Sequence, residues 1–312
     1  MAAASIDVVI PVYGGWEHTQ RCLRHLAAQT APHRVVVVDN DSPDDTRARL
    51  AEGFPHVDVI AMEANLGFAT AVNRGVEHGS GELLVVLNND VDLAPDCLAR
   101  LAGAFDDERV ASASPLLLSA DGTRIDAFGI AADPTLAGFV RLHGAPLEAL
   151  EYVERLPPPI GPYGAAAAYR RGAFEAAGGL DERIFMYGEE LDLALRLAAA
   201  GWRSVGVRAA RGTHVGGATA GKGSAWQRER GGFARGYTLR RYGVLRTRMA
   251  PRALLTETIV AAGDLVLSRD LAAARGRLSG WRAARGLPRH ERPATAAIGF
   301  AESLRLRVGD RR

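Results

Sequence analysis

Two kinds of segment alternate along the first third of the chain. Short apolar runs that suit buried strands are separated by stretches in which apolar residues recur at helical spacing. Strands are predicted at residues 6–12, 35–38, 57–62 and 83–87. Helices are predicted at residues 17–29, 68–77 and 95–105, and Ser42 with Pro43 marks another helix start. This order predicts an α/β fold whose mostly parallel sheet carries helices on both faces.

The pattern changes in the second half of the chain. Residues 157–162, rich in Pro and Gly, cannot form a helix and are expected to link two subregions. Helices are predicted at residues 171–177 and 189–200, a strand at 202–207, and a loop at 211–225. From Trp226 onward the pattern is helical and rich in Arg. The segment beyond Pro288 is expected to be frayed.

Composition narrows the class of protein. The chain has 312 residues, of which 47% are hydrophobic and 24% charged, which is typical of a globular protein able to bury a core. Its two cysteines, Cys22 and Cys97, cannot build a disulfide framework or a thiolate zinc cluster. No apolar run is long enough to span a bilayer, and no signal peptide is visible. We therefore expect a cytoplasmic location.

Charge is distributed unevenly along the chain. Residues 226–312 hold 19 Arg and 7 acidic residues, a net charge of +12, whereas residues 1–225 have a net charge of −10. A basic region of this kind favours an anionic partner. Nucleic acid is excluded because aromatic residues are sparse and not interleaved with the Arg residues. Two interpretations stay open: peripheral contact with an anionic membrane, or a helical cap with a solvated Arg face.

Polar and glycine residues follow each of the first four predicted strands. In an α/β sheet, ligands bind beyond these carboxyl ends of the strands. Asp90 and Asp92 lie so close in sequence that their carboxylates repel unless a cation separates them, and hard oxygen ligands suit Mg²⁺ or Mn²⁺. The chain has neither a G-x-G-x-x-G sequence nor a Walker loop, which argues against a dinucleotide or P-loop site.

Four of these loops and strand ends, at residues 9–13, 37–42, 65–69 and 87–92, occur together with further motifs later in the chain. In this combination they resemble glycosyltransferase family 2, the inverting enzymes with the GT-A fold. The resemblance runs in unbroken order from about residue 5 to about residue 220. Within the family the chain most resembles the bacterial rhamnosyltransferase-like branch, which builds cell-surface polysaccharide. The matching segments are residues 9–13, 37–42, 65–69, 87–92, 178–182, 187–193 and 200–202, together with Asn73, Gly75, His214, Gly216 and Gly217.

The resemblance implies a role for each matching residue. Asp39 would accept a hydrogen bond from the imide of the donor's base. The residues that would otherwise bind the nucleotide-sugar donor are Pro11, Tyr13, Asn65, Gly67, Asn73, Asn89 and Asp90. The residues that would hold the metal are Asp90, Asp92 and His214. The residues that would contact the acceptor are Asp181, Tyr187 and Trp202.

The catalytic base is implied by a family motif usually written Glu-Asp-x-Asp-Leu. Here the motif reads Glu-Glu-Leu-Asp-Leu, so Glu190 stands where the Asp base normally lies, and Glu189 is the rival. A Glu keeps the carboxylate and reaches one methylene further. Both residues would also suit a helix N-terminus electrostatically.

These implications combine into one functional hypothesis. A GT-A catalytic domain would span residues 1–225, with a nucleotide-sugar half over about 1–115 and an acceptor half over about 116–225, followed by an Arg-rich helical region over 226–312. The enzyme would move a sugar, with rhamnose one candidate, from a dTDP- or UDP-sugar to a hydroxyl of a glycan or lipid-linked acceptor, in cell-surface polysaccharide or glycoconjugate synthesis. Mg²⁺ or Mn²⁺ would neutralise the leaving diphosphate while a carboxylate takes the acceptor's proton.

Other interpretations stay open at this level. One is a natural-product glycosyltransferase of the same mechanism. A second is a nucleotidyltransferase, which the missing basic loop after the first strand disfavours. A third is an inactive carbohydrate-binding module, against which the intact carboxylates argue. The sequence also allows a homodimer and a peripheral contact at the inner face of the membrane.

Overall fold

The computed structural model describes residues 4–216 and 223–309. Its strands are β1 (Ile6–Val12), β2 (Arg34–Asp39), β3 (Asp58–Ala61), β4 (Leu83–Leu87), β5 (Val91–Leu93), β6 (Val110–Ser119), β7 (Ile125–Ala127), β8 (Ile130–Ala132), β9 (Gly138–Val140), β10 (Ala166–Arg170) and β11 (Arg203–His214). One large sheet has the order β3-β2-β1-β4-β10-β6-β11-β5, with β7 paired to β6, and β8 pairs with β9 separately.

The predicted α/β fold class is confirmed. Strands β1 to β4 pair in parallel, as the strand–helix order requires. Beyond β4 the sheet becomes mixed, because β10 runs antiparallel to both β4 and β6, while β11 is parallel to β6 and antiparallel to β5. The parallel half therefore brings four strand ends to one edge, and β5 and β11 extend that edge.

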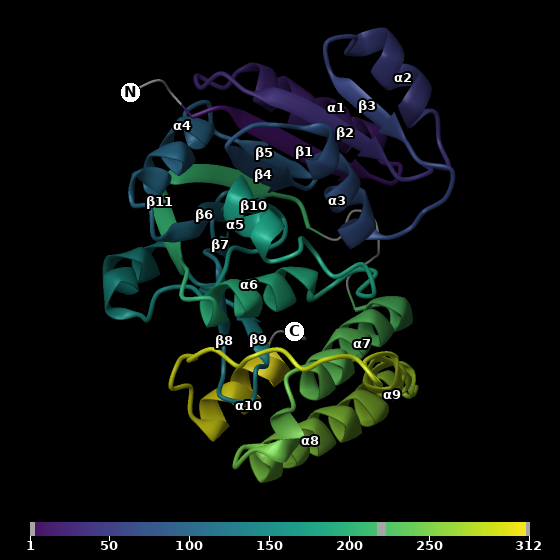
Figure 1. The fold of residues 1–312 in the computed structure, drawn as a ribbon, viewed down its shortest axis with the longest axis vertical. Coiled ribbons are helices and arrows are strands. Elements are labelled where there is room, and N and C mark those ends of the chain that lie inside the picture. The colour runs from purple at the N-terminus through teal and green to yellow at the C-terminus, as the bar shows by residue number, and fades with distance from the viewer. Residues whose placement is uncertain (1–3, 217–222, 310–312) are drawn as a thin grey trace.

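Helices cover both faces of this sheet (Figure 1). They are α1 (Trp16–Ala27), α2 (Thr46–Gly53), α3 (Phe68–His78), α4 (Cys97–Ala102), α5 (Arg171–Ala176) and α6 (Glu189–Ala199), with short 3₁₀ segments η1 (Gly103–Asp106) and η2 (Leu147–Arg155). Successive strand residues point to opposite faces, so Val8 packs with α1 and α4 in one hydrophobic cluster and Val9 packs with α3 and α6 in another. This explains the continuous apolar runs, since both faces of the central strands are buried.

The last strand is longer than the sequence predicts. The predicted strand at 202–207 continues to His214, so residues 211–214 are strand and not loop. The physical reason is two-sided pairing: Gly212 and Thr213 pair with β6 on one side and with β5 on the other, after an irregularity between Val207 and Arg211. Residues 217–222 of the predicted loop lie outside the described part of the chain.

The C-terminal region is helical, as predicted, and packs on the first region (Figure 1). It contains α7 (Ala225–Arg241), η3 (Val244–Arg246), α8 (Ala250–Ser268), α9 (Ala272–Ala283) and α10 (Phe300–Gly309). Leu239 and Tyr242 share a hydrophobic cluster with Leu136 and with Leu195 of α6. No helix among residues 4–216 and 223–309 is long and apolar enough to cross a membrane.

The expectation of a frayed segment beyond Pro288 is wrong. Residues 300–309 form α10, which docks through polar side chains. Ser303 is fully buried, and its hydroxyl donates to Asp133 Oδ2 at 2.7 Å. Arg307 Nη1 lies 2.7 Å from Glu257 Oε1. Ion pairs and hydrogen bonds, and not an apolar face, hold this helix on the protein. The sequence therefore lacks the apolar periodicity from which a docked helix is predicted.

Helices α7 and α9 cross at very close range. A Cβ added at Gly236 would lie 1.9 Å from the carbonyl oxygen of Arg277, and one at Gly280 would lie 1.9 Å from that of Phe233. Each helix carries two glycines four residues apart at the crossing, namely Gly232 with Gly236 and Gly276 with Gly280. Only glycine lets two helix backbones approach this closely.

Candidate active site

A carboxylate–histidine–carboxylate chain lies where β4 and β11 end. Asp90 follows β4, and His214 is the last residue of β11, which pairs with β5 so that His214 lies opposite Val91. His214 Nε2 lies 3.3 Å from Asp90 Oδ1, and His214 Nδ1 lies 2.8 Å from Oδ2 of Asp126 on β7. Burial alone would lower the pKa of His214, but the hydrogen bonds to Asp126 and Asp90 outweigh it and raise the pKa to about 9.

Asp92, the other predicted metal ligand, is not part of this chain of contacts. Its Oδ2 forms an ion pair with Arg21 Nε of α1 at 2.8 Å. Within the described residues, no three His, Cys, Asp or Glu side chains are grouped so that they could hold a metal ion by themselves. The structure thus supplies two candidate ligands, Asp90 and His214.

These two residues nevertheless fit a divalent cation. Mg²⁺ is typically held by one or two carboxylates together with substrate phosphates, so a full protein cage is not expected. A metal-binding His usually donates its other ring N–H to a carboxylate, and Asp126 accepts at Nδ1 here. A cation at this position would displace the proton from Nε2, the nitrogen facing Asp90, and bind its lone pair.

The loops after β1, β2 and β4 are tied together at the same edge. Gly14 N–H donates to Ser42 Oγ at 2.8 Å, and Asn89 Nδ2 donates to the carbonyl of Gly14 at 3.3 Å. Pro11 and Tyr13 are predicted to flank the nucleobase of the donor. Pro11 is half-buried, and Tyr13 is 42% exposed. The edge therefore brings Tyr13 and Asn89 into neighbouring loops.

Asp39, predicted to bind the base, is fully buried at the end of β2. Its Oδ1 accepts from the Ser42 N–H at 3.1 Å, and its Oδ2 pairs with Arg47 Nε at 2.7 Å. The carboxylate is therefore fixed in place by its own loop and by α2.

Asn65 and Gly67 connect the donor side to the segment before α6. Asn65 Oδ1 accepts from Asn40 Nδ2 at 3.0 Å and from the Gly67 N–H at 3.1 Å. Gly67 has φ of +93°, and a Cβ there would lie 2.5 Å from the carbonyl oxygen of Phe185. The N–H of Phe68 donates to that same carbonyl at 2.8 Å. This loop needs glycine because it packs directly on the Phe185 backbone.

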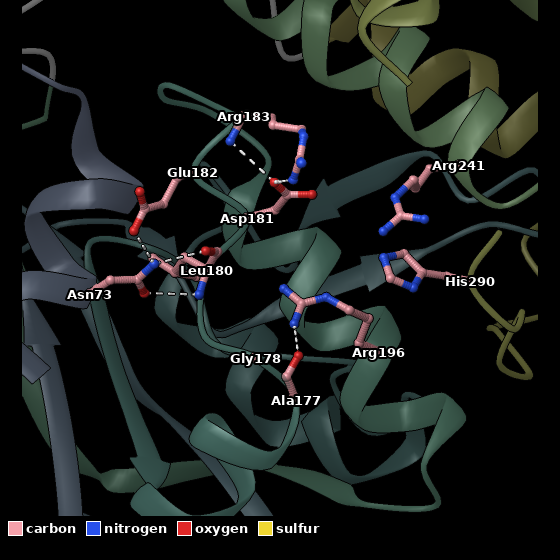
Figure 2. Close-up of a pocket in the computed structure, with 10 residues that line it drawn as sticks. All are labelled: Asn73, Ala177, Gly178, Leu180, Asp181, Glu182, Arg183, Arg196, Arg241 and His290. Atoms are coloured by element: carbon pink, nitrogen blue, oxygen red, sulfur yellow. Dashed lines mark hydrogen bonds and ion pairs between the residues drawn. The ribbon is translucent and has the colours of Figure 1, made fainter. Parts of the chain in front are cut away.

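Asn73 and Asp181 meet at the pocket drawn in Figure 2, where both hold the polypeptide in shape. The Asn73 amide donates to the Leu180 carbonyl at 2.9 Å and to Glu182 Oε1 at 3.0 Å. Asp181 Oδ2 accepts from the Tyr237 hydroxyl at 2.5 Å, which links this loop to α7. Arg241 and His290 lie on the opposite wall of the pocket.

Trp202 lies at the opposite end of β11 from His214. It immediately precedes β11, whereas His214 ends it, so the length of the strand separates them. The Trp202 ring packs on the cluster that also contains Val9 and Leu197.

The two candidate bases open α6. Gly188, in a left-handed conformation, caps the helix, and its N–H donates to Glu190 Oε2 at 3.0 Å. Glu189 Oε2 is buried and has no hydrogen-bond partner among the described residues. Burial raises the pKa of both carboxyls, and the charge of Glu190 raises that of Glu189 further.

The segment before β10 lies next to both His214 and Glu190. The ring of Tyr163 meets the ring of His214 edge-on, with centroids 6.1 Å apart. A Cβ at the next residue, Gly164, would lie 3.6 Å from Glu190 Cδ. Two successive residues therefore lie next to His214 and Glu190, which places both side chains beside the same short segment.

A group of aromatic residues lies close to the start of α6. The Trp226 ring, 40% exposed, meets the rings of Tyr187 and Phe185 edge-on, at 6.1 and 6.2 Å between centroids. Arg230 stacks over Phe185 and Trp226. Burial and the charge of Glu189 raise the pKa of Tyr187, in keeping with its place beside the carboxylates.

The sequence did not indicate several of the residues that make these contacts. Asp126, Tyr163 and Trp226 lie outside the matched motifs. Contacts between distant parts of the chain bring the first two to His214 and the third to Tyr187. The available signal for Tyr163 was its position directly after the Pro- and Gly-rich stretch at residues 157–162.

A family model, Glycosyl transferase family 2, matches residues 7–178. The chain belongs to this family. An N-acetylglucosaminyl-diphospho-decaprenol L-rhamnosyltransferase of Mycobacterium tuberculosis is 32% identical over 231 residues, covering 67% of this chain and 75% of that protein. A dolichol-phosphate mannosyltransferase of Pyrococcus furiosus is 33% identical over 105 residues, 32% of this chain and 30% of that protein. The family 2 protein described here is thus a glycosyltransferase of the rhamnosyltransferase-like kind.

Solved structures confirm the GT-A fold. A mannosyltransferase from Pyrobaculum calidifontis in complex with GDP-Man and Mn²⁺ superposes with a TM-score of 0.55 at 20% identity, covering 90% of this chain and 76% of that one. GalNAc-T7 with UDP, GalNAc and Mn²⁺ superposes with a TM-score of 0.58 at 18% identity, covering 81% and 51%. At these identities the likeness concerns the fold.

Proposed function

We propose that this glycosyltransferase moves a sugar from a nucleotide-diphosphate donor to a hydroxyl of a lipid-linked or glycan acceptor, with inversion at the anomeric carbon. The donor is a dTDP- or UDP-sugar, with rhamnose the leading candidate, and the product belongs to cell-surface polysaccharide or glycoconjugate synthesis. The similarity to a rhamnosyltransferase over two thirds of the chain supports this choice. The observation that carries it is that the segment Tyr163–Gly164 lies next to both His214 and Glu190.

Glu190 is the proposed general base. Its carboxylate takes the proton of the acceptor hydroxyl as that oxygen attacks the anomeric carbon and the bond to the diphosphate oxygen breaks on the opposite side. Burial raises the pKa of Glu190, which makes its ionised form a stronger base. The Gly188 N–H holds the side chain at the start of α6. One such displacement inverts the anomeric carbon.

Asp90 and His214 are the residues that would hold Mg²⁺ or Mn²⁺. A bound cation supplies positive charge that neutralises the diphosphate leaving group. Asp126 keeps His214 in the required tautomer by accepting at Nδ1. Asp92 serves the fold instead, through its ion pair with Arg21.

The remaining predicted residues divide by position. Pro11, Tyr13 and Asp39 are proposed to bind the base. Asn65, Gly67 and Asn89 shape the ribose and diphosphate region at the same sheet edge. Tyr187 faces the acceptor side, together with Trp226, which the sequence did not indicate.

Nucleotide binding tests the donor half of this proposal. Titration calorimetry with dTDP and with UDP should show binding with Mn²⁺ that weakens strongly in EDTA. Thermal shift with a panel of nucleotide sugars then identifies the donor, because a ligand that binds the folded state raises its apparent stability. Equal affinities with Mn²⁺ and with EDTA would contradict a metal-bridged diphosphate.

A further inference from the structure

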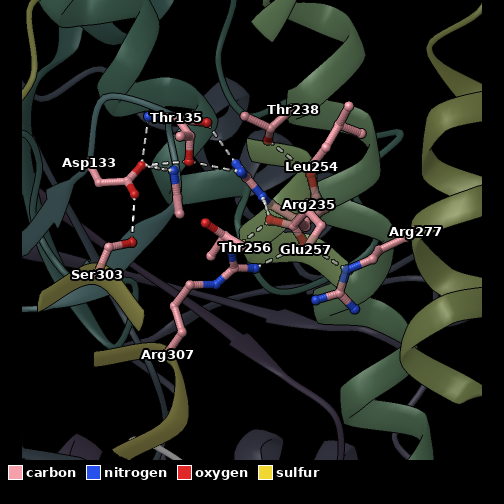
Figure 3. Close-up of polar contacts among 12 residues, drawn as sticks. Asp133, Thr135, Arg235, Thr238, Leu254, Thr256, Glu257, Arg277, Ser303 and Arg307 are labelled. Atoms are coloured by element: carbon pink, nitrogen blue, oxygen red, sulfur yellow. Dashed lines mark hydrogen bonds and ion pairs between the residues drawn. The ribbon is translucent and has the colours of Figure 1, made fainter. Parts of the chain in front are cut away.

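Helix α8 turns its charged side chains inward. Ala253, Thr256, Glu257, Val260 and Asp264 are its buried residues. Glu257 accepts from three guanidinium groups, with Arg235, Arg277 and Arg307 each within 2.8 Å (Figure 3). The side of α8 that faces the protein is therefore the polar one.

The opposite side of α8 is apolar and open. At 100° per residue, the exposed residues between positions 254 and 266 fall within an arc of about 140°, whereas Leu267, which is 72% exposed, lies outside it. This arc defines the outward face. Its residues are Leu254, Leu255, Thr258, Ile259, Ala262, Leu265 and Val266. Leu254 is 55% exposed and Val266 is 73% exposed. This outward face, about 18 Å long at 1.5 Å per residue, carries no charge. An exposed apolar patch of this kind marks an interaction site.

The charges around the outward face have one sign. Arg248 precedes α8 and Arg269 ends it, and both are exposed. The acidic residues between positions 246 and 289 are Glu257, Asp264 and Asp270, and each is in an ion pair with an arginine. On α9, Leu278 and Arg275 are also exposed.

We propose that the outward face of α8 docks on an anionic lipid bilayer, with its leucines at the acyl boundary and the flanking arginines on lipid phosphates. Apolar side chains on one helix face with arginines at the edges suit a helix lying in the membrane interface. A second copy of the chain is disfavoured, because symmetric pairing would bring Arg248 and Arg269 against like charges. The inference rests on the proposed function in one respect, since a lipid-linked acceptor places the substrate at a bilayer.

Vesicle flotation tests this surface directly. The full-length protein is mixed with phosphatidylcholine vesicles, or with vesicles in which about a third of the lipid is phosphatidylglycerol, at low and high salt. We expect binding to the anionic vesicles that weakens at high salt. The double variant Leu255→Glu/Val266→Glu should bind at least about tenfold more weakly, because two buried apolar contacts are replaced by like-charged carboxylates.

Val59→Glu provides the matched control. Val59 is 38% exposed on the edge strand β3, so the substitution adds a carboxylate to an exposed apolar site elsewhere. It should bind vesicles as the wild type does. Circular dichroism checks that both variants are folded. Absence of wild-type binding to anionic vesicles at low salt, or equal binding by the double variant, would overturn the proposal, and so would a dimer in sedimentation that the double variant dissociates without any vesicle binding.

The assay also separates this inference from the proposed function. Flotation needs no catalysis, so vesicle binding supports the docking surface even if no sugar transfer is found. In the other direction, the double variant should keep wild-type turnover on a water-soluble acceptor. Loss of that turnover would show that the outward face serves the catalytic fold, which would contradict a docking role.

Discussion

Asp90 and Asp92 lie two residues apart in sequence, but their carboxylates have different partners. Asp90 Oδ1 lies 3.3 Å from His214 Nε2, whereas Asp92 Oδ2 lies 2.8 Å from Arg21 Nε. The sequence predicts that both hold a cation. In the structure, Asp90 lies beside His214, whereas Asp92 is in an ion pair that ties β5 to α1.

Substitution of the two aspartates should separate these roles. We expect Asp90→Asn to weaken Mn²⁺-dependent dTDP or UDP binding by at least about tenfold, because a first ligand matters no less than the supporting residues of a metal site. Asp92→Asn should leave nucleotide affinity unchanged and lower stability by less than about 1 kcal/mol, since the Arg21 side chain is 44% exposed and solvent screens the ion pair. Calorimetry with Mn²⁺ measures the nucleotide affinity of both variants. An equal loss of affinity in the two variants would indicate that Asp92 also binds the metal.

Glu190→Gln should keep the shape of the side chain and remove its basicity. We expect nucleotide affinity to persist while kcat falls by roughly 10²–10⁴. Glu189→Gln should have much less effect, because burial and the neighbouring charge favour the protonated form of Glu189, which Gln resembles. Steady-state kinetics on both variants decide between the carboxyls. Normal turnover in Glu190→Gln together with a dead Glu189→Gln would reverse the assignment.

The pH dependence follows from the same environment. A general base works only when ionised, and burial raises the pKa of Glu190 above its ordinary value of 4.5. Activity should therefore be complete at high pH and fall as the pH drops through this raised pKa. Measurement of kcat against pH with saturating substrates tests this fall in activity. A profile that stays flat down to pH 4.5 would contradict a buried carboxylate base.

Glu257 should be a major determinant of stability in the C-terminal helices. Glu257→Gln leaves Arg235, Arg277 and Arg307 without their carboxylate, and breaking a buried ion pair costs about 3–5 kcal/mol. Burial opposes ionisation, but the three arginines hold the pKa of Glu257 well below 4.5. This contribution is present at neutral pH and is lost as the pH falls below 4.5, so the difference should be smaller at pH 3 than at pH 7.

Urea unfolding at the two pH values measures this difference. The exposed Glu302 on α10 gives the control, because Glu302→Gln should change stability by no more than about 0.5 kcal/mol. A Glu257→Gln variant as stable as this control at pH 7 would mean that the network contributes nothing.

Two helix glycines should respond oppositely to alanine. Gly280→Ala would place a Cβ 1.9 Å from the Phe233 carbonyl and should destabilise the fold by about 1–3 kcal/mol or more. Gly263→Ala on α8 meets nothing within 4 Å and should stabilise it by about 0.5–1 kcal/mol. Thermal unfolding of both variants checks the α7–α9 crossing, and shifts of the same sign would contradict it.

The sequence predicted the parallel half of the sheet because its physics is local. Residues such as Val8 and Val9 are buried on opposite faces, so each strand is a continuous apolar run, and the loops that follow carry polar residues. The mixed half depends on pairing between distant segments. Asp126 reaches His214 only because β7 pairs with β6 and β6 with β11.

The sequence predicted that the C-terminal region is helical, but it did not predict which faces of these helices are buried. Sequence patterns assume that apolar faces are buried, whereas α8 buries Glu257 and exposes Leu254, and α10 buries Ser303. Many of the arginines that suggested a free basic surface are held by internal carboxylates or carbonyls. Arg252, for example, lies 3.2 Å from Asp133 Oδ2.

Sugar transfer itself is the most direct test of the account. Wild type and Glu190→Gln are incubated with Mn²⁺, an N-acetylglucosaminyl-diphospho-polyprenol acceptor and a panel of nucleotide sugars that includes dTDP-rhamnose, and the anomeric configuration of the product is determined by NMR. The account predicts that the wild type forms a glycoside inverted relative to its donor, and that Glu190→Gln forms it roughly 10²–10⁴ times more slowly. A product that retains the donor configuration, or full activity in Glu190→Gln, would contradict a single displacement assisted by this carboxylate.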